Sequence, residues 1–168
     1  MRRRLFALAV LVHAAVLVGW VATIESALAR APRIRLDVLQ RDPRDLLRGD
    51  YVALRFAIDE IPEAAFGHGE APRPGDTVWV ALRPAGDGWE MASAATQRDA
   101  VAAADPRLIR GQVTSTYRGV HVDYGLGRYY VPEGRGTLPR GRLQAEIALP
   151  DGGGAYLTRL FIDGRPYP

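Results

Sequence analysis

The sequence predicts a mainly β protein, an antiparallel barrel or sandwich of about eight short strands carried on one N-terminal transmembrane helix. Three observations lead to this fold class. The chain opens with a long apolar run, 18 glycines and 12 prolines punctuate the sequence, and stretches of alternating apolar and polar residues recur between turns. Frequent Gly and Pro favour short strands and tight turns over long helices. We therefore expect residues 1–30 to form a membrane anchor and residues 31–168 to form one exported β-domain.

The apolar run begins at Leu5 and ends at Ile24. About 20 helical residues reach roughly 30 Å, which is the thickness of the hydrocarbon layer of a bilayer. Three arginines, residues 2–4, precede the run, and Glu25 follows it. Because positive residues stay on the cytoplasmic side, the sequence predicts a single-pass protein of the inner (cytoplasmic) membrane. Its N-terminus is expected in the cytoplasm, and its C-terminal domain is expected to be periplasmic or extracellular.

A cleaved signal peptide is the alternative for this segment. Ala27 and Ala29 match the small-x-small pattern that signal peptidase recognises, which leaves open cleavage after Ala29. The apolar run exceeds the roughly 7–15 residues of a usual signal-peptide core, and this length favours a retained anchor. His13 lies inside the run, where we interpret a single neutral imidazole as tolerated rather than functional.

The charge pattern and the missing residue types exclude several partners and chemistries. The net charge is +3, and residues 2–4 supply three positive charges, so the remainder of the chain is nearly neutral. A domain without a concentrated basic stripe is not expected to bind nucleic acid. The chain has no cysteine and no lysine, which excludes disulfides, thiolate ligands and a Ser-Lys catalytic pair. Neither a phosphate-binding loop nor a dinucleotide fingerprint occurs, so no cofactor is expected.

Alternation of side chains predicts where the strands lie. Along residues 51–58, every second side chain shares a face that we expect to pack in the core. The members of that face are Val52, Leu54, Phe56 and Ile58. Residues 62–74 are interpreted as a surface loop, and residues 94–106, which lack strand patterning, as a short helix or a loop. The other expected strands are residues 34–39, 77–82, 89–92, 108–109, 112–117, 120–124, 143–149 and 155–163.

Three short motifs stand out along the chain. The first opens with Gly49-Asp50-Tyr51 and continues through Leu54 to Phe56, so that a turn leads directly into a strand. The second motif is Gly127-Arg128-Tyr129-Tyr130-Val131-Pro132-Glu133-Gly134, and the third is Leu160-Phe161-Ile162-Asp163-Gly164. In this order they resemble the GDYXXLXY family of bacterial membrane-anchored proteins. Phe56 occupies the final tyrosine position of the naming motif.

The resemblance implies one N-terminal membrane span that carries an exported domain, commonly encoded beside a polytopic membrane protein and without an established activity. The phenylalanine at position 56 keeps the aromatic ring and lacks the hydroxyl, so packing is expected there rather than catalysis. The motif residues to which we assign structural roles are Gly49, Leu54, Phe56, Pro132 and Gly134.

Two motif carboxylates are candidates for chemistry. We interpret Asp50 as a turn residue that binds local backbone N–H groups, because Asp after Gly commonly caps a turn. Glu133 is interpreted as a turn residue paired with Arg128 or Arg135, although a pKa raised among tyrosines would make it an acid. The alternative function is therefore a small envelope hydrolase or transferase that uses Asp50 and Glu133.

A metal site is not expected. His121 and Asp123 are two residues apart, so they share a strand face and could bind one cation together. Two ligands do not make a site, however, and nothing in the sequence places His68 near them.

Tyrosines and arginines gather in residues 117–135, around the second motif. Both residue types present wide flat surfaces that keep hydrogen-bonding capacity, which is typical of binding patches. The residues predicted to bind are Tyr51, Asp50, Tyr129, Tyr130, Glu133 and Arg128. We expect a non-catalytic binding or accessory module for a polytopic membrane partner or an envelope ligand. A purely structural periplasmic module, with both motifs buried, is the third alternative.

Overall fold

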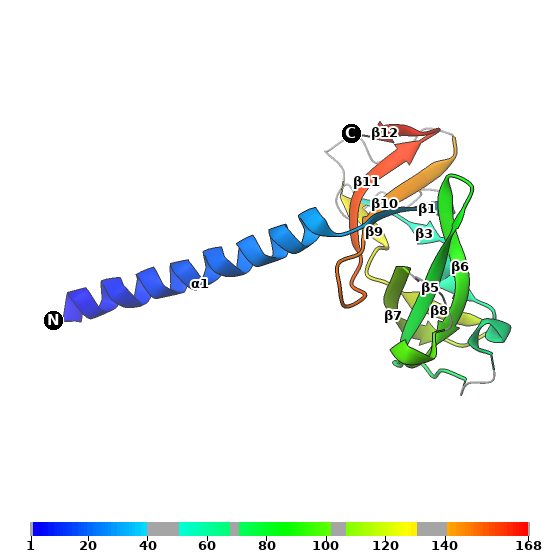
Figure 1. The fold of residues 1–168 in the computed structure, drawn as a ribbon, viewed down its shortest axis with the longest axis horizontal. Helices are drawn as coiled ribbons and strands as arrows, with labels where there is room; N and C mark the ends of the chain where they lie inside the picture. Colours follow the sequence, from blue (N-terminus) through cyan, green and yellow to red (C-terminus); the bar gives the residue numbers. More distant parts are fainter. Residues whose placement is uncertain (1, 40–50, 68–70, 102–106, 131–140, 168) are drawn as a thin grey trace. The chain divides into compact units, whose positions relative to one another are not determined.

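The computed structural model describes residues 2–39, 51–67, 71–101, 107–130 and 141–167. The chain forms two compact units, Met1–Ala31 and Pro32–Pro168. The first unit is helical and the second is built mainly of strands (Figure 1).

The helical unit is α1 (Arg2–Arg30), an uninterrupted helix of 29 residues. Its sequence is rich in Leu, Ala and Val and contains no proline, so nothing interrupts the backbone hydrogen bonds. The hydroxyl of Thr23 donates to the carbonyl of Gly19 at 2.8 Å, which satisfies it within the helix. The helix is long and apolar enough to cross a membrane. Length and composition of this kind suit a retained anchor and a signal sequence alike.

Within its described residues, the second unit consists of strands, three short 3₁₀ helices and the turns and loops between them. Its longer strands are β1 (Arg33–Leu39), β5 (Thr77–Ala85), β6 (Gly88–Ala95), β7 (Arg107–Ser115), β8 (Val120–Asp123), β10 (Leu143–Ala148) and β11 (Tyr156–Ile162). Its shorter strands are β2 (Tyr51–Ala53), β3 (Arg55–Phe56), β4 (Glu60–Ile61), β9 (Arg128–Tyr130) and β12 (Arg165–Tyr167). The 3₁₀ helices are η1 (Ala57–Asp59), η2 (Glu63–Phe66) and η3 (Arg98–Ala100).

Most strands belong to one large mixed sheet. Its path runs β12-β11-β10-β1-β6-β5-β7-β8-β4, with β3 paired to β1 off this path, and β2 and β9 form a separate two-stranded ribbon. The path does not close on itself, so the unit is sandwich-like, which confirms the mainly β prediction. Two details differ from expectation. The β1–β6 pairing is parallel, at Leu36 and Trp89. In the described ranges the strands outnumber the expected eight, because several have only two or three residues.

The expected strand at residues 51–58 is divided into β2, β3 and η1. The division occurs at Leu54. Its backbone N–H still donates to the carbonyl of Gly127 at 3.0 Å, in register with the β2–β9 pairing, and Arg55 and Phe56 then pair with β1. The predicted alternation of burial nevertheless holds, because Leu54, Phe56 and Ile58 are all buried. Likewise, β6 extends into the segment interpreted as a helix or loop, and η3 follows it.

The turn between β10 and β11 packs against β5. Gly153 in this turn has φ of +79°, and its carbonyl accepts the backbone N–H of Arg110 at 2.8 Å. A Cβ atom at Gly153 would collide with the indole ring of Trp79. The guanidinium of Arg98 lies 5.5 Å from the centroid of that ring, within cation–π range. Glycine is therefore required here by contact as well as by backbone conformation.

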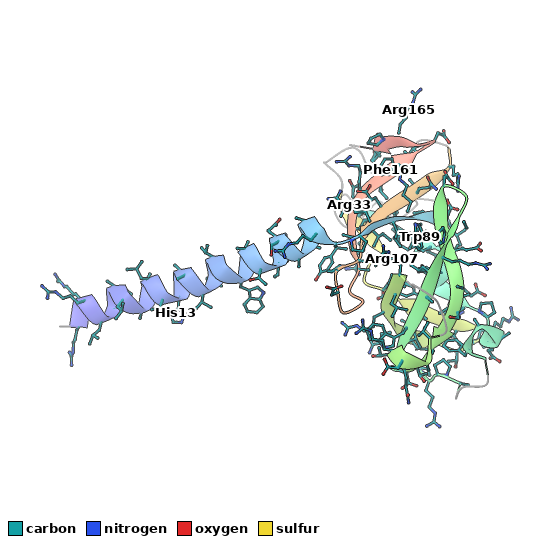
Figure 2. The ribbon with its side chains drawn as sticks, in the orientation of Figure 1. His13, Arg33, Trp89, Arg107, Phe161 and Arg165 are labelled. Atoms are coloured by element: carbon teal, nitrogen blue, oxygen red, sulfur yellow. The ribbon has the colours of Figure 1, made fainter. Side chains whose placement is uncertain are left out.

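Charged side chains of β1 contact residues from other segments of the second unit. Arg142 forms ion pairs with Asp37 of β1 at 3.0 Å and with Asp87, between β5 and β6, at 2.8 Å. The guanidinium of Arg35 on β1 lies 4.1 Å from the centroid of the ring of Phe161 on β11, across the intervening strand β10. Phe161 is labelled in Figure 2. These contacts are partly exposed, so they position the segments more than they stabilise the fold.

We expect Gly153→Ala to lower the free energy of unfolding by about 1–3 kcal/mol more than Gly152→Ala, because only the first change overpacks the ring of Trp79. Gly152 is a matched control, since it has φ of +99° and open space around it. Denaturant unfolding of the full chain in detergent measures the difference. Equal losses in the two variants would show that the contact with Trp79 is unimportant.

Candidate functional site

The first two sequence motifs lie side by side in the structure. Strands β2 and β9 pair antiparallel, and the register sets Tyr51 opposite Tyr130 and Ala53 opposite Arg128. The hydrogen bond from Leu54 to the carbonyl of Gly127 continues the contact beyond the ribbon. Segments far apart in the sequence therefore form one surface.

The structure places some of the predicted binding residues and not others. Tyr129 is half-buried and packs against the core, and Arg128 is exposed. For Tyr51 and Tyr130 the backbone alone is described. The remaining predicted motif residues, Gly49, Asp50, Pro132, Glu133 and Gly134, lie outside the described residues. The use of Asp50 and Glu133 as catalytic carboxylates therefore stays a prediction.

A pocket of about 260 Å³ adjoins the junction of the two motifs. Its apolar lining includes Leu54 and Phe56 from the first motif, and Gly127 comes from the second. Its polar lining consists of Arg55, Asp59, Thr114, His121 and Asp123. These side chains come from β3, η1, β7 and β8, so the pocket exists only when the sheet and the motif segment are assembled.

A second pocket of about 390 Å³ shares Arg55, Phe56 and Asp59 with the first. It also includes Glu60 of β4 and Arg118, which precedes β8. The shared residues thus contribute to two hollows, and the segment of residues 55–59 carries polar groups into both.

Asp59 is the most perturbed carboxylate in the described part of the chain. Burial is the main cause that raises its pKa from 3.8 to about 6. Two effects oppose burial: the backbone N–H of Phe56 donates to Asp59 Oδ2 at 2.8 Å, and Arg55 contributes a positive charge. The charge of Asp123 makes the smallest contribution and acts in the same direction as burial. A carboxyl group with a pKa near 6 exchanges protons in the neutral range, where ordinary aspartates stay ionised.

Tyr124 lines the first pocket and holds the segment of residues 55–59 in place. It belongs to the tyrosine-rich range of residues 117–135, but only 7% of it is exposed, so its side chain is part of the core and not of a surface patch. Its hydroxyl donates to the carbonyl of Ile58 at 2.9 Å. Burial, followed by the charge of Asp59, raises the pKa of the phenol, so Tyr124 stays neutral and acts as a donor. Gly111 makes room for the ring, because a Cβ there would lie 2.8 Å from it.

The side chains of His121 and Asp123 on β8 each form a hydrogen bond with a nearby backbone group. The Nε2 atom of His121 lies 3.1 Å from the carbonyl oxygen of Tyr117, so Nε2 carries the proton and Nδ1 is an acceptor in the neutral ring. Asp123 accepts the backbone N–H of Gly125 at 2.8 Å. No group of three metal-binding side chains occurs within the described ranges, and His68 lies outside them.

Sequence reasoning missed Asp59, Arg55 and Thr114 as pocket residues. Residues 55–58 were interpreted only as part of an alternating strand, and Asp59 was assigned no role. One signal was present, because an aspartate three residues after Phe56 has the spacing of a side chain that caps a turn. Its burial, however, depends on β8, which is distant in the sequence.

A family model described as GDYXXLXY protein matches residues 13–160, which is most of the chain. The chain belongs to the GDYXXLXY family. This match spans both motifs and every residue that lines the first pocket. Comparisons with curated proteins and with solved structures gave no match.

We expect Asp59→Asn to stabilise the protein at about pH 7.5 and to lose this advantage at about pH 4.5. The pKa of Asp59 is raised on folding, so its stabilising contribution is complete below the unfolded value of 3.8 and is lost as the pH rises through about 6. Asparagine avoids that loss and retains an oxygen that accepts the Phe56 N–H. After a discount for the solvent exposure of this half-buried group, the change is about 1–2 kcal/mol.

Denaturant unfolding of the full chain at the two pH values measures this difference. The control is Asp76→Asn, since Asp76 likewise caps a turn by accepting the backbone N–H of Arg73. A pH response of Asp59→Asn that matched the control would contradict the raised pKa of Asp59.

Proposed function

We propose that this GDYXXLXY protein is a membrane-anchored accessory domain of the bacterial envelope, and that it binds a polytopic membrane protein through the surface where its two motifs meet. The observation that supports this most is the pairing of β2 with β9, because it joins the family's naming motif to the second motif beside a polar pocket. The candidate site comprises this ribbon and the first pocket.

The chemistry of the site suits a polar protein segment. Arg55 supplies donors, His121 Nδ1 supplies an acceptor in the neutral ring, and Thr114 lines the same hollow. Nearby, Tyr117 is 71% exposed, and the guanidinium of Arg118 lies 5.2 Å from the centroid of its ring. Exposed tyrosine and arginine are the residue types enriched in protein interfaces.

The proposed location follows from the charges around α1. Arginines at residues 2–4 precede the apolar run, and Glu25 follows it, which favours a cytoplasmic N-terminus. The β-domain is then on the periplasmic side of the inner membrane. In this arrangement the candidate site faces periplasmic loops of the partner.

A second candidate function is a small envelope hydrolase or transferase. The observation that favours it is Asp59, because a carboxyl group with a pKa near 6 beside a second carboxylate, Asp123, suits general acid catalysis at neutral pH. The pair proposed from the sequence, Asp50 and Glu133, lies outside the described residues. A turnover that falls at least about a hundredfold in Asp59→Asn, with partner binding unchanged, would favour this candidate.

We expect Arg55→Ala and His121→Ala each to reduce recovery of a membrane partner by about tenfold, because both remove polar groups from the pocket. The measurement is cross-linking and affinity isolation of the tagged full-length chain from native membranes. Arg83→Ala is the matched control, since Arg83 is an exposed strand arginine, paired with Glu90, that does not line either pocket. Recovery of no membrane protein, or equal recovery with all three variants, would refute the proposed site.

We expect the full-length chain to remain in the membrane fraction with its C-terminus outside the cytoplasm. A periplasm-active reporter fused after Pro168 should be active, and the same reporter fused before Arg2 should be inactive. Mass spectrometry of the mature protein tests retention of the helix. A mature chain that begins at Arg30 would show that the segment is a cleaved signal peptide.

A further inference from the structure

The imidazole of His13 has one ring nitrogen for which the described residues provide no hydrogen-bond partner. Its Nδ1 atom lies 2.8 Å from the carbonyl oxygen of Ala9, one helical turn earlier. A carbonyl oxygen only accepts, so Nδ1 carries the proton and donates. The Nε2 atom of the neutral ring is then an acceptor at the outer end of a side chain that projects from α1 (Figure 2).

The depth of His13 makes this acceptor costly in a bilayer. The apolar run begins at Leu5, and eight residues of helix place His13 about 12 Å along a hydrocarbon layer of about 30 Å. No water satisfies polar groups at that depth, and an unpaired acceptor there is unfavourable. Thr23 has no such need, because its hydroxyl donates to Gly19 within the helix.

His13 also lies on a seam with the spacing of a helix pair. The seam consists of Phe6, Ala9, His13, Val16, Trp20 and Thr23. Their intervals alternate between three and four residues, which is the repeat of a left-handed pair of helices. Both polar residues of the apolar run are on this seam, and the small side chain of Ala9 allows a second helix to approach His13 closely.

We propose that this seam binds a transmembrane helix of a different membrane protein, which donates a hydroxyl or side-chain amide hydrogen to Nε2 of His13. The inference rests on the proposed function and adds the partner's chemistry within the membrane. A second copy of this chain does not fit, because two neutral copies would present Nε2 acceptors to each other. A single polar residue on such a seam fixes register and partner.

The test is photo-cross-linking of the full-length chain in its native membranes. A photo-reactive phenylalanine analogue replaces Val16 on the seam or, as a matched control, Val18 on the opposite side of the helix; the two valines are 61% and 68% exposed. We expect an adduct with another protein from position 16 and not from position 18. His13→Leu should lower that adduct about three- to tenfold, and His13→Gln, which keeps an acceptor, should restore it.

The cross-linked peptide should belong to a membrane helix that contains Ser, Thr, Asn or Gln. An adduct of twice the chain's mass, equal adducts at both positions, indifference to His13→Leu, or no adduct would overturn the inference. Protease resistance of the β-domain in the His13 variants checks that they fold. Two results separate this inference from the proposed function. If affinity isolation recovers a partner in an Arg55-dependent manner but position 16 gives no adduct, this inference alone fails. If neither experiment recovers a partner, the proposed function fails as well.

Discussion

The hydrogen bond from Leu54 to Gly127, together with the β2–β9 pairing that precedes it, is the contact on which the candidate site depends. Beyond it the chain leaves its partner β9, and Arg55 and Phe56 pair with β1 before η1 begins. Phe56 and Ile58 then remain in the core while Arg55 and Asp59 line the pockets. A continuous strand would have kept the alternation without η1, which brings Asp59 toward β8.

Opposing electrostatic effects set the pKa of the Asp59 carboxyl group. Burial and Asp123 disfavour its charge, while Arg55 and the N–H of Phe56 favour it. The carboxyl group therefore sits near the point where its protonation changes in the neutral range. Tyr124 maintains the position of the same segment through Ile58, from a site that Gly111 leaves open. Asp59, whose pKa is raised, is thus held in position by Tyr124 and Gly111, to which we assign no chemical role.

The sequence predicts the local features of this fold well, because alternation depends only on neighbouring residues. It correctly predicted burial of Leu54, Phe56 and Ile58. It failed where the cause is distant: the change of pairing partner after Leu54, from β9 to β1, depends on strands that lie elsewhere in the sequence. One local signal was overlooked, since Asp163 and Gly164 both have positive φ and form the turn into β12.

The candidate site was predicted only in part, for the same reason. Residues of both motifs were predicted to bind, and strands of the two motifs pair, whereas their use as one binding site stays a prediction. It could not show that Tyr124 turns inward, because a tyrosine beside glycine has the same local pattern in a surface patch and in a core. The space that Gly111 leaves for the ring becomes apparent only when β7 and β8 are paired.

The attachment of β1 has a mechanical consequence. This strand begins at Arg33, directly after the helix that ends at Arg30, and it lies inside the sheet with β10 on one side and β6 on the other. Its longer ladder, to β10, is antiparallel, with hydrogen bonds perpendicular to the strands. A pulling force applied to the chain N-terminal to β1 therefore enters the sheet through β1 and loads those bonds in shear, all together. Attachment through an edge strand such as β12 would instead let the sheet peel apart one bond at a time.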